Sequence, residues 1–169
     1  MKRLFVLRHA KSSWSDAELA DFERPLNDRG LAAAPFMGRL MKDRNLTPDI
    51  VLSSPASRAR QTTELVREAA GWKPKIRFDD RIYEASPLTL LRVAEELSNG
   101  IGSAMVVGHN PGMEGFIRVL TGRLESMPTA ALAIIDLAID DWALIAAGSG
   151  RLVEVIRPKE LMPRASRKP

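Results

Sequence analysis

Three short apolar runs, each followed at once by small or polar residues, constrain the fold of this chain more than any other feature of its sequence. The runs are Leu4–Leu7, Ile50–Leu52 and Ala104–Val107. Uninterrupted runs of this length are typical of strands buried on both faces of a parallel sheet. Segments with apolar residues at helical spacing lie between them. We therefore expect an α/β fold, a three-layer sandwich in which a mostly parallel central sheet carries helices on both faces.

Residues that begin or end helices flank these helical segments. Asn27 or Asp28 is able to cap the first helix, and Gly71 is able to end the second. Pro35 falls inside the first helical segment, which predicts a kink or a late start there. Gly122 is expected to end a later, shorter helix.

The last third of the chain has the pattern of a strand-rich edge. Ala131–Ile139, Trp142–Ile145 and Leu152–Ile156 predict strands, with a tight turn before the last of them. Prolines and charged residues dominate from there on. We expect a single domain over residues 1–157 and a basic C-terminal tail over residues 158–169.

Composition excludes several classes of protein. The chain has no cysteine, which excludes disulfides, thiolate metal sites and cysteine nucleophiles and favours a reducing, cytoplasmic location. No apolar stretch is long enough to span a bilayer, so we expect no membrane partner. The net charge is +4, but five basic residues lie in the last thirteen positions and aromatic residues make up only 5%, so we expect no nucleic-acid partner. The sequence leaves the oligomeric state open.

The two histidines of the chain share the same local setting. His9 follows the first apolar run, and His109 follows the third, one glycine after it. Ligands of open parallel sheets bind at the carboxyl ends of the strands. The two imidazoles are therefore expected to converge on one pocket, although they lie 100 residues apart in the sequence.

Two arginines are predicted to lie at the same edge. Arg8 precedes His9, and Arg58 follows the second apolar run, in the expected first turn of a helix. Guanidinium groups bind phosphate oxygens in a bidentate manner, and helix N-termini favour anions. Two guanidiniums and two imidazoles together predict a pocket for a phosphoryl group.

Three ordered motifs carry a resemblance to a known family. Leu7–Ala10, Ser53–Thr62 and Val107–Gly112 together resemble the histidine phosphatase superfamily, and more narrowly its SixA-type phosphohistidine phosphatases. The resemblance runs from Lys2 to about Ile156. It implies a phosphoglycerate-mutase-like α/β fold, no metal or other cofactor, and a phosphohistidine intermediate. Ala10 stands where the superfamily commonly has glycine, a departure that the SixA type tolerates.

The resemblance also implies roles for individual residues. His9 corresponds to the nucleophile, and Arg8, Arg58 and His109 correspond to the groups that hold the phosphoryl group. A neutral imidazole is the attacking species, so the other nitrogen of His9 is expected to bond an acceptor, and His109 is expected to work as a cation. Positioning and electrostatics of this kind are most of what phosphoryl transfer requires.

The remaining candidates are Glu84, Ser15 and Asn110. Glu84 resembles the acidic position of the superfamily and is either a general acid or a solvated loop carboxylate. Ser15 and Asn110 follow the two histidines and are expected to add substrate contacts.

Three functions remain open at this point. The first is a metal-independent phosphatase acting on phosphohistidine in a phosphorylated protein, and the second is a phosphatase for small phosphomonoesters. The third is a module that binds phosphate without turnover. A metallohydrolase with His9 and His109 as ligands is a distant further alternative, because arginines beside both histidines repel a cation.

Overall fold

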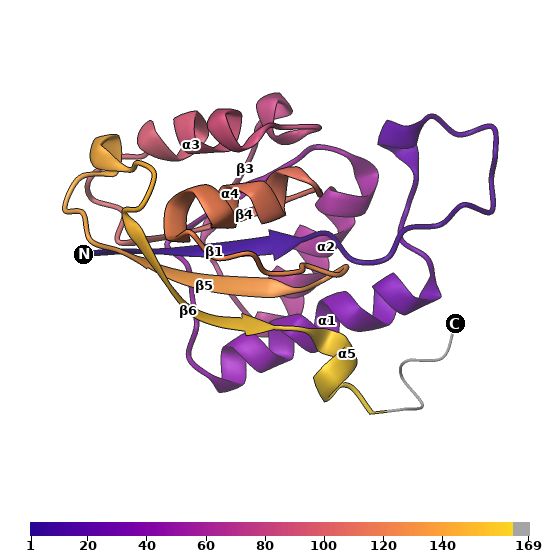
Figure 1. Ribbon diagram of the computed structural model, residues 1–169. Helices are drawn as coiled ribbons and strands as arrows, with labels where there is room; N and C mark the ends of the chain where they lie inside the picture. Colours follow the sequence, from indigo (N-terminus) through magenta and orange to yellow (C-terminus); the bar gives the residue numbers. More distant parts are fainter. Residues whose placement is uncertain (164–169) are drawn as a thin grey trace.

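The computed structural model describes residues 1–163 and contains one six-stranded sheet (Figure 1). The strand order is β3-β2-β4-β1-β5-β6. β1 to β4 run parallel, whereas β5 is antiparallel to both of its neighbours. This arrangement confirms the expected α/β fold with a mostly parallel sheet. The strands are β1 (Lys2–Arg8), β2 (Ile50–Ser53), β3 (Lys75–Phe78), β4 (Ser103–Gly108), β5 (Leu132–Leu137) and β6 (Gly150–Ile156).

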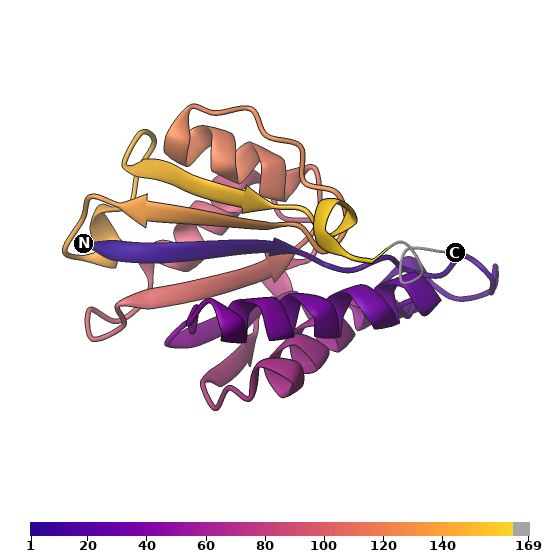
Figure 2. The ribbon, with the colours of Figure 1, turned by 90° about the horizontal axis from the view of Figure 1, so that it is seen from below.

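Helices cover both faces of the sheet, as expected. Helices α1 (Asp28–Asp43) and α2 (Ser57–Ala70) lie on one face, and α3 (Pro87–Glu95) and α4 (Gly112–Thr121) lie on the other (Figures 1 and 2). The alternation of side chains along β1 explains both layers. Leu4 and Val6 join the core beneath α3 and α4, whereas Phe5 and Leu7 join the core beneath α1 and α2.

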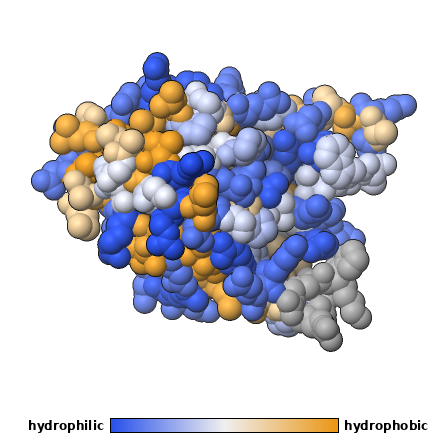
Figure 3. Space-filling model, in the orientation of Figure 1, coloured by the Kyte–Doolittle hydropathy of each residue, from blue (hydrophilic) through white to orange (hydrophobic). Residues whose placement is uncertain are grey.

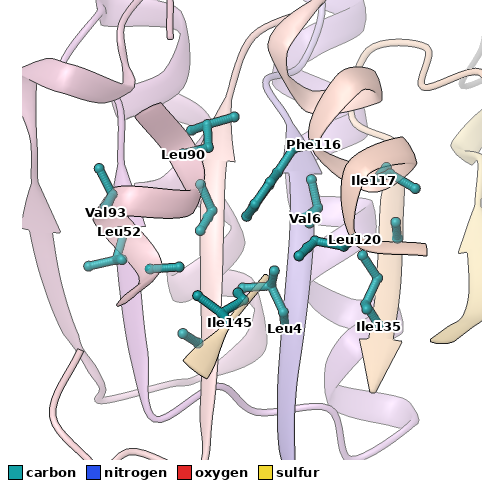
Figure 4. Close-up of a cluster of buried hydrophobic side chains, with 14 of the residues drawn as sticks. Leu4, Val6, Leu52, Leu90, Val93, Phe116, Ile117, Leu120, Ile135 and Ile145 are labelled. Carbon is teal, nitrogen blue, oxygen red and sulfur yellow. The ribbon is translucent and has the colours of Figure 1, made fainter. Parts of the chain in front are cut away.

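The core on the α3 and α4 side is shown in Figure 4. Leu4 and Val6 of β1 meet Phe116 and Leu120 of α4, with Leu90 of α3 close by. All five side chains are almost completely buried. Because β1 is buried on both faces, the chain that leaves its carboxyl end starts from a rigid position.

The predicted helix ends agree with the structure, apart from the effect of Pro35. The side chain of Asn27 caps α1 by accepting from the amide of Gly30 at 3.0 Å. Gly71 and Gly122 end α2 and α4 with φ values of 69° and 74°, in the left-handed region that favours glycine. Helix α1 begins at Asp28, directly after its cap, and continues through Pro35 to Asp43.

One segment of the last third differs from the prediction. The strand predicted at Trp142–Ile145 is wrong, because residues Trp142–Leu144 form the 3₁₀ turn η3. Asp141 caps that turn by accepting from the amide of Ala143, and the buried indole of Trp142 donates to the carbonyl of Ile101 at 2.7 Å. Trp142 and Ile145 of this segment are buried, whereas Ala143 and Leu144 are exposed, so the segment is a turn anchored in the core by two side chains. Two further 3₁₀ turns are η1 (Asp21–Glu23) and η2 (Asp80–Ile82).

The start of the predicted tail packs against the body. Pro158–Leu161 form the short helix α5, in which Pro158 is buried, and Met162 after it is also buried. Met162 and Pro163 lie beside Leu31 and Phe36 of α1. The rest of the expected tail lies outside the described residues, so the boundary at residue 157 stays a prediction.

Candidate active site

The two histidines meet at the carboxyl ends of β1 and β4. These strands are parallel neighbours in which Arg8 pairs with Gly108, so the next residue of each strand emerges at the same edge of the sheet. The amide of His9 donates to the carbonyl of Gly108 at 3.0 Å. The two imidazole centroids are 5.0 Å apart. The sheet register thus brings together two side chains that are far apart in the sequence.

His9 is held as a neutral ring with one nitrogen engaged. Its Nδ1 donates to the carbonyl of Ala10 at 2.7 Å, which leaves the lone pair on Nε2. The amide of Ala10 in turn donates to Thr62 Oγ1, which donates to the carbonyl of Arg58. Burial, with a smaller effect of His109 and the two arginines, lowers the pKa of His9 to about 3. At neutral pH Nε2 of His9 therefore keeps a free lone pair.

His109 lies beside His9 and bonds Ser54, the residue that directly follows β2. Its Nε2 is 2.8 Å from Ser54 Oγ, and that oxygen also accepts from the amide of Ala56. Nδ1 of His109 is buried and has no hydrogen-bond partner among the described residues. Burial, followed by the cation of Arg58, lowers the pKa of His109 to about 4. The sequence predicted a cation, but burial makes the ring of His109 neutral in the free protein.

Arg8 and Arg58 also point buried donors at this edge of the sheet. Arg58, in the first turn of α2, is 6% exposed, and its terminal nitrogens bond the carbonyl and the carboxylate of Asp21 at 2.7 and 3.0 Å. One terminal nitrogen of Arg8 donates to the carbonyl of Met127 at 3.1 Å. The Nε atoms of both arginines are buried without a partner among the described residues.

Unpartnered buried nitrogens are concentrated at this site. Four such side-chain atoms occur among residues 1–163, and three of them belong to Arg8, Arg58 and His109. A buried donor without an acceptor costs about 1–3 kcal/mol, so such a cluster is characteristic of a binding site for a polar ligand. Two guanidiniums beside neutral imidazoles select an anion with several acceptor oxygens.

Asp21 is a residue of the site that the sequence analysis missed. Besides Arg58, its carboxylate accepts from Arg24 Nε at 3.2 Å and from the hydroxyl of Tyr83 at 2.6 Å. The hydrogen bond from Tyr83, together with Arg58, lowers the pKa of Asp21 to about 2, so the carboxylate stays ionised. The ring of Tyr83 packs edge-on against His109, with centroids 5.6 Å apart.

Asp21 lies in the loop between β1 and α1, which projects from the body of the protein at the right of Figure 1. Figure 3 shows hydrophilic and apolar residues intermixed on this projection. Within the loop, Arg24 packs over the ring of Trp14 at 3.5 Å and donates to Ser12 Oγ at 3.0 Å. No sequence motif marked Asp21, and the only signal was its position in the polar segment after the first strand.

The weaker candidates Ser15, Asn110 and Glu84 have different surroundings. Ser15 is exposed in the projecting loop, where it bonds Ser13 at 2.8 Å. The amide of Asn110 donates to Glu114 and to the carbonyl of Met127, both at 2.9 Å, so its donors are used within the protein. Glu84 is exposed and, together with His109, lines a neighbouring cavity of about 570 Å³.

Two further observations concern metals and membranes. Among the described residues, no three His, Cys, Asp or Glu side chains gather as ligands for a metal ion. None of the helices formed by residues 1–163 combines the length and apolar character needed to traverse a bilayer.

Comparisons with known proteins agree with this geometry. A family model described as "Histidine phosphatase superfamily (branch 1)" matches residues 4–90. An uncharacterised protein of Mycobacterium tuberculosis is 32% identical, over 87% of this chain and 96% of its own length.

Solved structures extend the similarity to nearly the whole chain. The protein assigned as phosphohistidine phosphatase SixA from Agrobacterium tumefaciens is 33% identical, with a TM-score of 0.81 over 93% of this chain and 98% of that one. A protein histidine phosphatase SixA in complex with tungstate has a TM-score of 0.82 at 24% identity, over 95% of this chain and 99% of that one, which shows the same fold. Phosphoglycerate mutase structures share it too, so the fold is phosphoglycerate-mutase-like.

Proposed function

Because the chain belongs to the histidine phosphatase superfamily and is a phosphatase of its SixA type, we propose that it dephosphorylates phosphohistidine on a protein through His9. One observation carries the proposal. The neutral imidazole of His9, with Nδ1 engaged and Nε2 free, lies within 5.0 Å of His109, ring centre to ring centre. Arg8, Arg58 and His109 each have an unpartnered buried nitrogen, and all three are near enough to His9 to lower its pKa.

The proposed reaction has two displacements at phosphorus. Nε2 of His9 attacks the phosphoryl group, the bond from phosphorus to the substrate imidazole breaks, and its electron pair stays on the departing nitrogen. Water then attacks phosphorus, the bond to Nε2 breaks, and phosphate leaves with His9 restored. Arg8, Arg58 and His109 donate hydrogen bonds to the phosphoryl oxygens and balance their charge in both steps.

A protein substrate and a metal-independent reaction are the finer parts of the proposal. The segment between Tyr83 and β4 contains only α3 and its short connections, so no large insertion covers the site from that side. The charge that a metal ion would supply is instead supplied by two arginines. We further propose a cytoplasmic location, as the cysteine-free sequence predicts.

The nucleophile is tested by replacing His9 with alanine. Loss of the attacking nitrogen should lower turnover of a phosphohistidine protein by on the order of 10³-fold or more, because nothing else in the site replaces it. Wild-type protein quenched during turnover should carry phosphate in an acid-labile, alkali-stable form, and His9→Ala should not. Both measurements are made with EDTA present, which also tests metal independence.

A matched control and a competing substrate complete the test. Lys11→Ala removes an exposed side chain two residues away and should leave turnover within about twofold. Near wild-type activity of His9→Ala would end the proposed mechanism. Faster turnover of a sugar phosphate than of the phosphohistidine protein would instead identify an enzyme for small phosphomonoesters, and phosphate binding without turnover would identify a binding module.

A further inference from the structure

The cavity beside His109 has walls from two segments that the site described above does not use. It measures about 570 Å³ and lies between the segment that leads into α3 and the first turns of α4. This volume is within the range of small-molecule sites, about 300–1,000 Å³. His109 lines it and His9 does not. The cavity therefore shares His109 with the phosphoryl site.

Gly112 and Gly115 line the cavity and allow close packing of the elements around it. A methyl group on Gly112 would overlap the carbonyl oxygen of Ala85, and one on Gly115 would come within 2.6 Å of the ring of Pro87. Helix α4 thus lies directly against the segment before α3. The cavity is consequently bounded by fixed, well-packed elements.

The walls offer apolar surface and few free polar groups. Ala85, Pro87 and Pro111 supply apolar surface. Of the polar side chains, Ser86 accepts from the amide of Thr89 as the cap of α3, and the amide of Asn110 is used by Glu114 and Met127. A sugar with several hydroxyls would lose its bonds to water here without replacing them, which is unfavourable. A flat, largely apolar ring forms few hydrogen bonds to water, so it loses few of them on entering the cavity.

Glu84 adds a charge to this otherwise apolar wall. Its carboxylate is exposed and lines the cavity together with His109. An imidazole that carries phosphorus on one nitrogen leaves as a neutral ring when its other nitrogen is already protonated. A carboxylate near that ring stabilises the protonated form. The single acidic group in an apolar wall is thus complementary to a protonated imidazole.

We propose that this cavity is the subsite for the leaving group and that it takes the imidazole ring of the substrate phosphohistidine. The proposal rests on the proposed function, because it assigns the leaving group of that same reaction. In-line displacement requires the leaving nitrogen to lie on the side of phosphorus opposite Nε2 of His9, and this cavity is lined by His109 but not by His9. Ala85 lines the cavity and takes part in none of the contacts described for the phosphoryl site, so we expect it to determine specificity.

Two substrates with the same bond to phosphorus separate the subsite from the chemistry. Phosphohistidine and phosphoramidate both contain a phosphorus–nitrogen bond, but only phosphohistidine carries a ring. Ala85→Leu should lower kcat/KM for phosphohistidine by at least about 10-fold, because extra methyl groups occupy the space of the ring. Its kcat/KM for phosphoramidate should stay within about twofold of wild type, which also shows that the variant is folded.

The control is the same substitution at an exposed alanine that does not line the cavity. Ala147→Leu, in the turn before β6, should leave the ratio of the two kcat/KM values unchanged. An unchanged ratio in Ala85→Leu overturns the subsite. A loss shared equally by both substrates, in Ala85→Leu and in the smaller change Ala85→Val, also overturns it. Wild-type protein that hydrolyses phosphoramidate but not phosphohistidine would instead refute the proposed function.

Discussion

The site is built from two regions that use different physics. His9 and His109 follow strands at the centre of the sheet, are 6% and 9% exposed, and each bonds one group within the core. Asp21 lies on the projecting loop with 47% of its side chain exposed, and it is tied to Arg58, Arg24 and Tyr83 by charged or short hydrogen bonds. Backbone register positions the first region, and a side-chain network positions the second.

The strand-end region is suited to the chemical step, whereas the loop region orients Arg58. The buried imidazoles are neutral because water is excluded from them, which suits attack on phosphorus. The carboxylate of Asp21 stays ionised and holds one terminal nitrogen of Arg58, while the backbone carbonyl of Asp21 holds the other, so that Nε remains the free donor. We therefore expect large losses of function from changes at the strand ends and smaller losses from changes in the loop.

After the loss of His9 itself, removal of the second imidazole is expected to give the largest effect. His109→Ala should lower kcat on phosphohistidine protein by about 100- to 1,000-fold, the range for removal of one donor that stabilises developing charge. Rapid-quench kinetics of phosphoenzyme formation measure the loss. Ser54→Ala keeps the ring of His109 and removes its hydrogen bond to Ser54 at 2.8 Å, so kcat should fall less than in His109→Ala. A decrease below about 10-fold for His109→Ala would contradict the importance assigned to the strand ends.

Acid should destabilise the strand-end region before it affects the loop. The native pKa values of His9 and His109, about 3 and about 4, lie below the unfolded value of about 6.5. The unfolded chain therefore binds more protons between about pH 4 and 6.5, and the free energy of unfolding falls as the pH is lowered through this window. Each ring should account for a loss of about 2 kcal/mol between pH 6.5 and pH 5.

Urea unfolding at the two pH values measures this loss. His109→Gln removes one titrating ring and should reduce the loss by about half. Asp21, with its pKa lowered to about 2, remains ionised throughout the window and should add nothing to it. The same pH dependence in His109→Gln as in the wild type would show that this ring is not held neutral by burial.

Changes in the loop network are expected to have the smallest effect. Asp21→Ala removes the ion pair with Arg58 and keeps the hydrogen bond from Arg58 to the backbone carbonyl, and kcat/KM should fall by about 10-fold, mostly through KM, since one charged contact of this kind is worth about 1.5 kcal/mol. Tyr83→Phe removes one hydrogen bond to the same carboxylate and should lower kcat/KM by about threefold. Inhibition by vanadate should weaken in parallel. Faster turnover by Asp21→Ala would show that Asp21 competes with the phosphoryl group for Arg58.

The sequence by itself determined the elements that carry the strand-end groups. Uninterrupted apolar runs predict buried parallel strands, and the residues that follow such strands lie at one edge of the sheet, which is where the structure places His9 and His109. The caps at Asn27 and Gly71 were also predicted, because a helix end depends on local backbone conformation. These features depend on neighbours within a few residues.

Only the tertiary structure decided which other side chains complete the site. Asp21 meets Arg58 across 37 residues and Tyr83 across 62, and no local pattern marks such encounters. The neutral state of His109 likewise depends on burial beneath groups from three different segments. Periodicity in a sequence reports which face of one element is buried, whereas hydrogen bonds and electrostatic environments depend on how separate elements pack together.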